Sequence, residues 1–308
     1  MMFRIAHISD LHVLSRTGAE WRAMLFNKRI TGYANTLLRR GRVHRRDFLI
    51  AVLQAASKEA DHVVVTGDIT NLALESEYDD ARSLLSGVAR SVEVTVVPGN
   101  HDLYLPPIFH ERHFAYHFGD FLKSDLPELA LDLPAGPFPS VKLRGPVAIV
   151  GVSSAVPRPP FIASGFVGDK QLDALVRMLA HPEVARRTAV ILIHHPPVDG
   201  RSRIAQMRDG LVDGAAFRRA LAPLARGLVL FGHVHMRVRC VLPTPAGTLD
   251  VVAASGAALD HPNASVRAGF NLYDIAGDGA IERIGARVLD ASGSAFENAS
   301  IAERTECI

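Results

Sequence analysis

Short apolar runs, each ending in polar residues, recur along the chain. Runs rich in valine and isoleucine predict β-strands at 3–8, 62–66, 92–97, 147–152, 189–193, 228–231, 249–254, 270–275 and 281–289. Apolar residues at helical spacing predict helices at 46–59, 75–88, 169–180 and 213–225. Strands and helices alternate in the earlier part, which predicts an α/β fold with helices covering the sheets. The strand-rich part from about residue 240 predicts an antiparallel portion or a second packed sheet.

The chain has 308 residues, of which 48% are apolar, enough for one large α/β domain with a substantial core. No internal repeat or low-complexity linker divides it, so residues 1–308 are predicted to form a single domain. The stretch 133–140 is rich in proline and glycine and predicts a surface loop.

The sequence shows no targeting signal and has only two cysteines. No apolar run approaches the roughly 18 residues of a membrane-spanning helix, and the first residues lack the pattern of a secretory signal. We therefore expect a cytoplasmic protein. The two cysteines, Cys240 and Cys307, are too few for a disulfide framework and predict ordinary reduced thiols.

Basic residues gather in one segment, at about 14–46, although the net charge of the chain is only +2. From Arg16 to Arg46 the only acid is Glu20, and Trp21 and other apolar residues lie among the cations. We interpret the segment as a helical insert, and three roles stay open. The three roles are a flap with a solvated basic face, a clamp for a phosphate-rich substrate, and a peripheral contact with the anionic inner face of a membrane.

Five predicted strands end in polar clusters that share carboxylate, imidazole or amide groups: Asp10 and His12; Asp68; Asn100, His101 and Asp102; His194 and His195; His233 and His235. Each cluster alone is typical of an ordinary turn. Their recurrence at the carboxyl ends of strands is not, because open α/β sheets build their sites at that edge. The sequence therefore predicts one functional site assembled from five loops.

The donor set indicates the chemistry of this site. Oxygen and imidazole donors without thiolate suit Mn, Fe, Zn, Co or Ni. The candidate ligands are more than one ion usually takes: Asp10, His12, Asp68, Asn100, His194, His233 and His235. They suit two ions if one carboxylate bridges them, and paired ions about 3.5–4 Å apart are a recurring device for in-line displacement at phosphorus.

The polar clusters form five motifs along the chain: Asp10-x-His12, Gly67-Asp68, Gly99-Asn100-His101-Asp102, His194-His195-Pro196 and Gly232-His233-Val234-His235. In this order, the motifs resemble the calcineurin-like metallophosphoesterase family, and most of all its bacterial class III cyclic-nucleotide phosphodiesterase and glycerophosphodiesterase branch. The resemblance implies a four-layer αββα sandwich, in which two mixed β-sheets are flanked by helices. It also implies two divalent metal ions, Mn, Fe or Zn, and hydrolysis of a phosphodiester by a hydroxide that bridges them.

Ligand roles follow from the same resemblance. One ion would be held by Asp10, His12, Asp68 and His235, and the other by Asp68, Asn100, His194 and His233. Asp68 would be the bridge, and His194 rather than His195 would be the ligand because it stands two residues before the proline. His195 would face the substrate or pack.

His101 is implied to be the catalytic residue that lies over the phosphate, where it stabilises developing charge or protonates the leaving oxygen. Asp102 would accept a hydrogen bond from His101 and fix its tautomer.

The resulting hypothesis is a dinuclear phosphodiesterase whose substrate is a cyclic nucleotide or a similar small diester. One alternative is a membrane-surface hydrolase of a nucleotide-linked lipid pyrophosphate or a phospholipid. A more remote alternative is a metal-free protein-binding scaffold, which would be expected to lack ligands. No nucleic-acid duplex is expected as partner, since the short remainder after His235 leaves little room for a DNA-binding domain. The natural substrate, the metal and the oligomeric state stay undetermined by the sequence.

Overall fold

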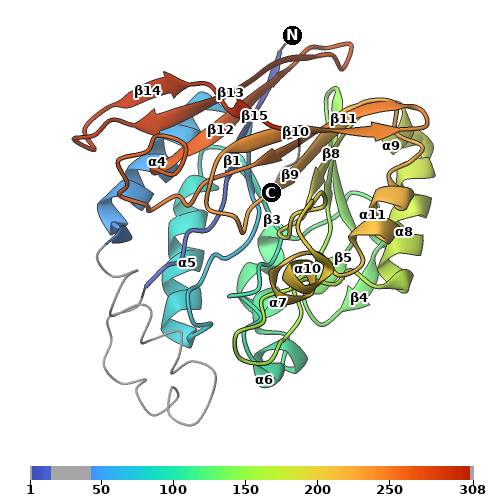
Figure 1. Cartoon of the computed structure of the whole chain (residues 1–308), viewed down its shortest axis with the longest axis horizontal. Coiled ribbons are helices and arrows are strands. Elements are labelled where there is room, and N and C mark those ends of the chain that lie inside the picture. The colour runs from blue at the N-terminus through green and yellow to red at the C-terminus, as the bar shows by residue number, and fades with distance from the viewer. Residues whose placement is uncertain (1, 15–42, 306–308) are drawn as a thin grey trace.

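Two β-sheets form the centre of the molecule in the structure, a computed structural model that describes residues 2–14 and 43–305 (Figure 1). The first sheet has the strand order β14-β13-β12-β1-β2-β3. Its strands are β1 (Phe3–Ile8), β2 (His62–Val65), β3 (Glu93–Val96), β12 (Gly269–Ile275), β13 (Ile281–Leu289) and β14 (Phe296–Ala299). Strands β1, β2 and β3 are parallel, whereas β12 pairs antiparallel with β1, so the sheet is mixed.

The second sheet is also mixed, with the order β15-β10-β11-β9-β8-β7-β6. Its strands are β6 (Ser140–Arg144), β7 (Val147–Gly151), β8 (Thr188–Leu192), β9 (Gly227–Phe231), β10 (Val238–Thr244), β11 (Gly247–Ala253) and β15 (Ala302–Glu303). The parallel strands β7, β8, β9 and β11 form its centre, and β6 and β10 pair antiparallel at the two sides.

Side chains of the second sheet alternate between two apolar cores. In β9, Leu228 and Leu230 join the core that contains Ile5 of the first sheet. Val229 and Phe231 point the other way, into the core beneath the outer helices. This two-residue period places one face of the sheet against the first sheet and the other against helices. Burial on both faces explains why the strand appears in the sequence as an unbroken apolar run.

Helices cover the outer faces of both sheets (Figure 1). The first sheet carries α4 (Arg46–Glu59) and α5 (Glu75–Val88), and the second carries α8 (Asp169–Ala180), α9 (Pro182–Ala185) and α11 (Gly214–Ala220). Short helices lie in the loops: α6 (Pro106–His110), α7 (His113–Phe118), α10 (Arg203–Asp209) and the 3-10 turns η3 (Gly119–Phe121) and η4 (Pro127–Leu129). The predicted four-layer αββα sandwich is thus confirmed.

Two local predictions were wrong. Residues 133–140 are not a surface loop: β4 (Leu131–Leu133) and β5 (Gly136–Phe138) form a hairpin there, and Phe138 is fully buried. The prolines and glycines of this stretch are typical of loops, so the sequence pattern did not indicate the hairpin. The helix predicted at 213–225 ends at Ala220, in keeping with the nearby Pro223, because proline disfavours helical geometry in the residue before it.

The expectation of two reduced thiols was wrong as well. Cys240 in β10 is disulfide-bonded, and no described cysteine is free. The other cysteine of the sequence, Cys307, lies outside the described residues. Among the helices that the structure describes, none has both the length and the apolar character needed to cross a lipid bilayer.

Most of the basic segment at about 14–46 lies outside the described residues, so its helical form and its membrane contact stay predictions. Its last two cations are described. Arg45 pairs with Asp47 and lies over the ring of Phe48, and Arg46 pairs with Asp80. Both side chains are therefore used in ion pairs at the start of α4.

Candidate metal centre

The loops that follow the parallel strands meet above the carboxyl edges of the two sheets. Their backbones are joined by hydrogen bonds, for example from Asp10 N to Gly67 O at 3.0 Å and from His12 N to Asp68 O at 3.0 Å. Another runs from Gly232 N to His194 O at 3.1 Å. The structure thereby brings together residues that are far apart in the sequence, as the positions of the strand ends predicted.

Several candidate ligands have left-handed backbone geometry, with φ of 51° at Asp10, 43° at His12, 49° at Asp68, 69° at His233 and 52° at His235. Such geometry costs a residue with a side chain about 1–3 kcal/mol. It persists only where the surroundings enforce it, and it is concentrated at functional sites.

Two glycines allow the loops to approach closely. A Cβ atom on Gly99 would lie 2.2 Å from both the backbone nitrogen and Oδ1 of Asp68, and one on Gly232 would lie 1.9 Å from Ser9 Oγ. Side chains at these positions would therefore push apart the loops that carry the candidate ligands.

We expect Gly99→Ala to destabilise the protein by about 1–3 kcal/mol, the usual cost of overpacking, and to reduce its metal content because Asp68 must move. Gly87→Ala is the matched control: a Cβ there meets nothing within 4 Å, so stability should stay equal or rise slightly. Thermal unfolding and metal analysis of both variants would check this. Equal behaviour of the two variants would contradict it.

The first group of ligand atoms comprises Asp10, His12, Asp68 and His235, all within 4.8 Å of one another. His12 Nε2 lies 3.4 Å from His235 Nε2, and 3.9 Å from both Asp10 Oδ1 and Asp68 Oδ2. His235 Nε2 lies 3.3 Å from Asp10 Oδ1. These are the residues that the family resemblance implied for one ion.

The second group surrounds Asn100. Its Oδ1 lies 3.2 Å from His194 Nε2 and 3.0 Å from His233 Nδ1, and the two ring nitrogens are 3.3 Å apart. His194 Nε2 is also 3.5 Å from Asp68 Oδ1. Asp68 therefore turns one carboxylate oxygen toward each group, which is the position of a bridging ligand.

Both groups fit divalent cations. Atoms bound to one ion at about 2.0–2.2 Å lie roughly 3.0–3.6 Å apart. All the distances given for the second group and two of the four given for the first lie in this range, and the other two are 3.9 Å. Asp10 Oδ1 is buried and accepts no hydrogen bond, a costly state for a carboxylate oxygen unless a cation is near it. An adjacent pair of cations is therefore compatible with the residues present.

The charge of Asp68 and the tautomer of His233 agree with this fit. Although burial acts in the opposite direction, His194 and His101 hold the pKa of Asp68 well below its usual range, so its carboxylate is ionised. Burial, and next the charge of His194, lower the pKa of His233 to about 3. The neutral His233 ring donates its Nε2 hydrogen to Asp209 O at 2.8 Å, which leaves a lone pair on Nδ1, facing Asn100 Oδ1.

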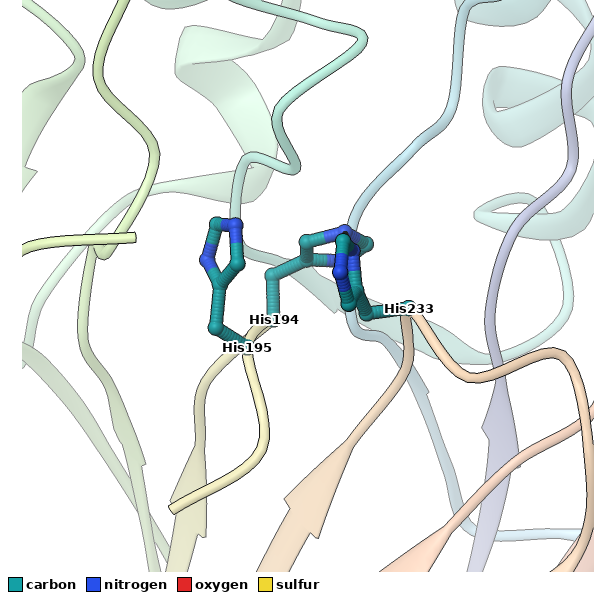
Figure 2. A group of neighbouring side chains, drawn as sticks. All are labelled: His194, His195 and His233. Atoms are coloured by element: carbon teal, nitrogen blue, oxygen red, sulfur yellow. Dashed lines mark hydrogen bonds between the residues drawn. The ribbon is translucent and has the colours of Figure 1, made fainter. Parts of the chain in front are cut away.

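His194 and His195 are adjacent but have different hydrogen-bond partners. Figure 2 shows their two rings beside that of His233. His194 contacts Thr66 O through Nδ1 at 2.7 Å, so its Nε2 faces the second group. His195 uses both nitrogens elsewhere, Nδ1 with Ser154 Oγ at 2.8 Å and Nε2 with Ala163 O at 2.9 Å. His195 also offers a ligand atom within 4.8 Å of those of His194 and His233. Because both of its nitrogens have hydrogen-bond partners, the contacts favour His194 as the ligand.

The expected hydrogen bond between His101 and Asp102 is absent, and that expectation was wrong. His101 Nδ1 instead faces the backbone oxygen of Asn71 at 2.5 Å. Because a carbonyl can only accept, Nδ1 carries a hydrogen, and Nε2 is the ring nitrogen whose protonation can change. The Asp102 carboxylate accepts from the backbone of Ile69, Thr70 and Gly99 at 2.7–3.2 Å, which ties two loops of the site together.

Sequence reasoning missed the groups that orient the candidate site residues. Three are backbone carbonyls, of Thr66, Asn71 and Asp209, which hold His194, His101 and His233. A carbonyl is present in every residue, so no sequence signal marks these. Tyr104 stacks on the His101 ring with centroids 5.4 Å apart. It stands three residues after His101, and this aromatic neighbour was the only available signal.

A family model for calcineurin-like phosphoesterases matches residues 3–237, so the chain belongs to this family of metal-dependent phosphoester hydrolases. It is 25% identical over 240 residues to a probable cyclic nucleotide phosphodiesterase of Rhodococcus erythropolis, covering 75% of this chain and 64% of that relative. The chain thus spans less than two thirds of the relative's length.

Solved structures are similar in fold. A dimetal phosphatase from Danio rerio has a TM-score of 0.60 at 14% identity, covering 97% of this chain and 99% of that one. A purple acid phosphatase from yellow lupin (Lupinus luteus) seeds has a TM-score of 0.58 at 12% identity, covering 98% of this chain and 54% of that one. At these identities the similarity shows the shared fold alone.

Proposed function

We propose that the chain hydrolyses small phosphodiesters, cyclic nucleotides among them, with two divalent cations. The observation that carries the proposal is the position of Asp68, whose two carboxylate oxygens face two adjacent groups of ligand atoms. The diester preference is supported by the name of the Rhodococcus relative. The proposed ligands are Asp10, His12, Asp68 and His235 for one ion, and Asp68, Asn100, His194 and His233 for the other.

Bound there, the two cations would supply a water of lowered pKa and positive charge for the phosphoryl oxygens. The protein's own groups hold the geometry: His101 N donates to Asp68 Oδ1 at 2.7 Å and His233 N to Asp10 Oδ2 at 3.1 Å. These bonds fix the carboxylates before substrate arrives, which is the preorganisation that efficient catalysis requires.

His101 is the proposed general acid. Its Nδ1 hydrogen is held by the carbonyl of Asn71, so the ring gives a proton from Nε2 to the departing oxygen and is left in a defined neutral tautomer. The side chain is half-buried and lies against His12, with ring centroids 4.8 Å apart. It therefore stands beside the proposed ligands and is still reached by solvent.

The identities of the ions, Mn, Fe or Zn, are part of the proposal. The cytoplasmic location expected from the sequence is not, because Cys240 is disulfide-bonded and disulfides persist mainly in oxidising compartments. A metal-free protein-binding scaffold would be expected to lack some of the metal ligands. All the candidate ligands are present in the described site, which disfavours this alternative.

The test is hydrolysis by metal-depleted protein resupplied with Mn²⁺. The panel contains a cyclic nucleotide, a glycerophosphodiester, bis-p-nitrophenyl phosphate and the monoester p-nitrophenyl phosphate. We expect kcat/KM for the diesters to exceed that for the monoester by about tenfold or more, which equals about 1.4 kcal/mol in the barrier. A preference for the monoester would contradict the diester assignment. No Mn²⁺-dependent hydrolysis of any ester would contradict the enzymatic one.

A further inference from the structure

A separate group of side chains able to bind a metal lies where helix α7 packs against helix α5, outside the candidate metal centre. Figure 1 shows the two helices. Its members are Glu75, His113 and His117, each of which offers one ligand atom within 4.8 Å of the others. Glu75 is the first residue of α5, and the two histidines stand four residues apart on α7. Residues at this spacing share one face of a helix.

The Glu75 carboxylate lies between the two imidazoles. Its Oε1 is 2.6 Å from His113 Nδ1, and its Oε2 is 3.0 Å from His117 Nε2. Two imidazoles and one carboxylate are a donor set used by zinc sites with a position left open to water. The Glu75 side chain is 56% exposed, so water can reach such a position.

The outer nitrogen of each imidazole faces a further carboxylate. His113 Nε2 is 3.0 Å from Glu111 Oε2, and His117 Nδ1 is 3.5 Å from Asp79 Oδ1. A histidine that binds a metal through one nitrogen almost always donates the hydrogen on its other nitrogen to a carboxylate, carbonyl or water. Here His113 has that second partner in hydrogen-bond contact, and His117 has a carboxylate 3.5 Å from its outer nitrogen.

His117 supplies independent support. Its side chain is 4% exposed, and Nδ1 is buried and makes no hydrogen bond. When the neutral ring donates from Nε2 to Glu75, Nδ1 turns a lone pair toward the Asp79 carboxylate, so that two acceptors face each other. A cation on Nε2 would shift the hydrogen to Nδ1, which would then point at Asp79. The arrangement is therefore complementary to a bound cation.

We propose that Glu75, His113 and His117 bind a third divalent transition-metal ion, with Zn²⁺ as the reference ion. The ligands are His113 Nδ1, His117 Nε2 and Glu75, while Asp79 and Glu111 orient the rings. The ion joins α7 to the start of α5, so its role is structural. The ion also stiffens the candidate metal centre through a chain of contacts. The His117 ring stacks on the Tyr78 ring with centroids 4.8 Å apart, and the Tyr78 hydroxyl donates to the backbone oxygen of Asp102, beside His101.

The test compares Zn²⁺ content and thermal stability of the whole protein in three forms. They are the wild type, the double variant Glu75→Gln/His113→Gln, and the control double variant Glu128→Gln/His110→Gln, whose exposed side chains have the same chemistry but lie outside the group. Each form is stripped of metal, equilibrated with excess Zn²⁺, freed of unbound ion and analysed by mass spectrometry for zinc per chain.

We expect the Glu75→Gln/His113→Gln variant to hold one zinc ion fewer per chain than the wild type and the control. Zn²⁺ should also raise its Tm by a few degrees less, because an ion that binds only the folded state stabilises it. The quantity compared is the difference in zinc content per chain between the forms of the protein, so the outcome does not depend on the function proposed above. Equal zinc content in all three forms would overturn the proposal. If the double variant does not fold, Glu75→Gln alone, at a half-exposed side chain, gives the same comparison.

Discussion

Asp68→Asn is expected to abolish most of the hydrolytic activity and to remove one or two metal ions per chain. The substitution keeps the shape of the side chain but replaces one of the two oxygens by an NH2 group, which cannot bind a cation. Because Asp68 Oδ1 and Oδ2 face different groups of ligand atoms, one group loses its donor and both lose negative charge. A loss of several kcal/mol of transition-state stabilisation corresponds to about 10³-fold or more in kcat/KM.

The measurement is kcat/KM on bis-p-nitrophenyl phosphate together with metal analysis after dialysis. Asp173→Asn is the matched control, because this exposed aspartate on α8 belongs to neither group of ligand atoms and should leave both quantities unchanged. If Asp68→Asn kept its full metal content and more than a tenth of its activity, Asp68 would not be the bridge.

The α/β class and the convergence of the candidate ligands were largely predictable from the sequence pattern, and the four-layer arrangement followed from the family resemblance. Strands such as β9 are buried on both faces and appear as apolar runs, and the polar residue that ends each run marks the carboxyl edge of a sheet. Sheet order was not predictable. β12 lies beside β1 although the two are separated by most of the chain, and such pairing depends on contacts that no local pattern records.

Roles that depend on backbone groups and short elements were beyond sequence reasoning. Asp102 was expected to hold His101, yet it binds the N–H groups of Ile69, Thr70 and Gly99, because the local turn directs its carboxylate away from the ring. The proposed third ion site was missed for a related reason. Helix α7 has only six residues, too few for a helical period to show, so His113 and His117 did not appear to share a face.

His101→Ala is expected to lower kcat by about 10²–10⁴-fold, the usual contribution of a positioned general acid, while the metal content stays unchanged. The backbone nitrogen of His101, which donates to Asp68 Oδ1 at 2.7 Å, is kept in the alanine variant. The bridge therefore stays fixed, and only the imidazole between Asn71 O and the leaving group is lost.

The leaving group separates acid catalysis from mere positioning. A p-nitrophenolate departs without a proton, whereas the alkoxide of a cyclic nucleotide or a glycerophosphodiester needs one. We therefore expect His101→Ala to slow the alkyl diesters much more than bis-p-nitrophenyl phosphate, with His110→Ala, an exposed histidine on α6, as the unaffected control. Equal losses on both kinds of substrate would remove the proton-donor role, since a group that only orients the phosphate affects every leaving group alike.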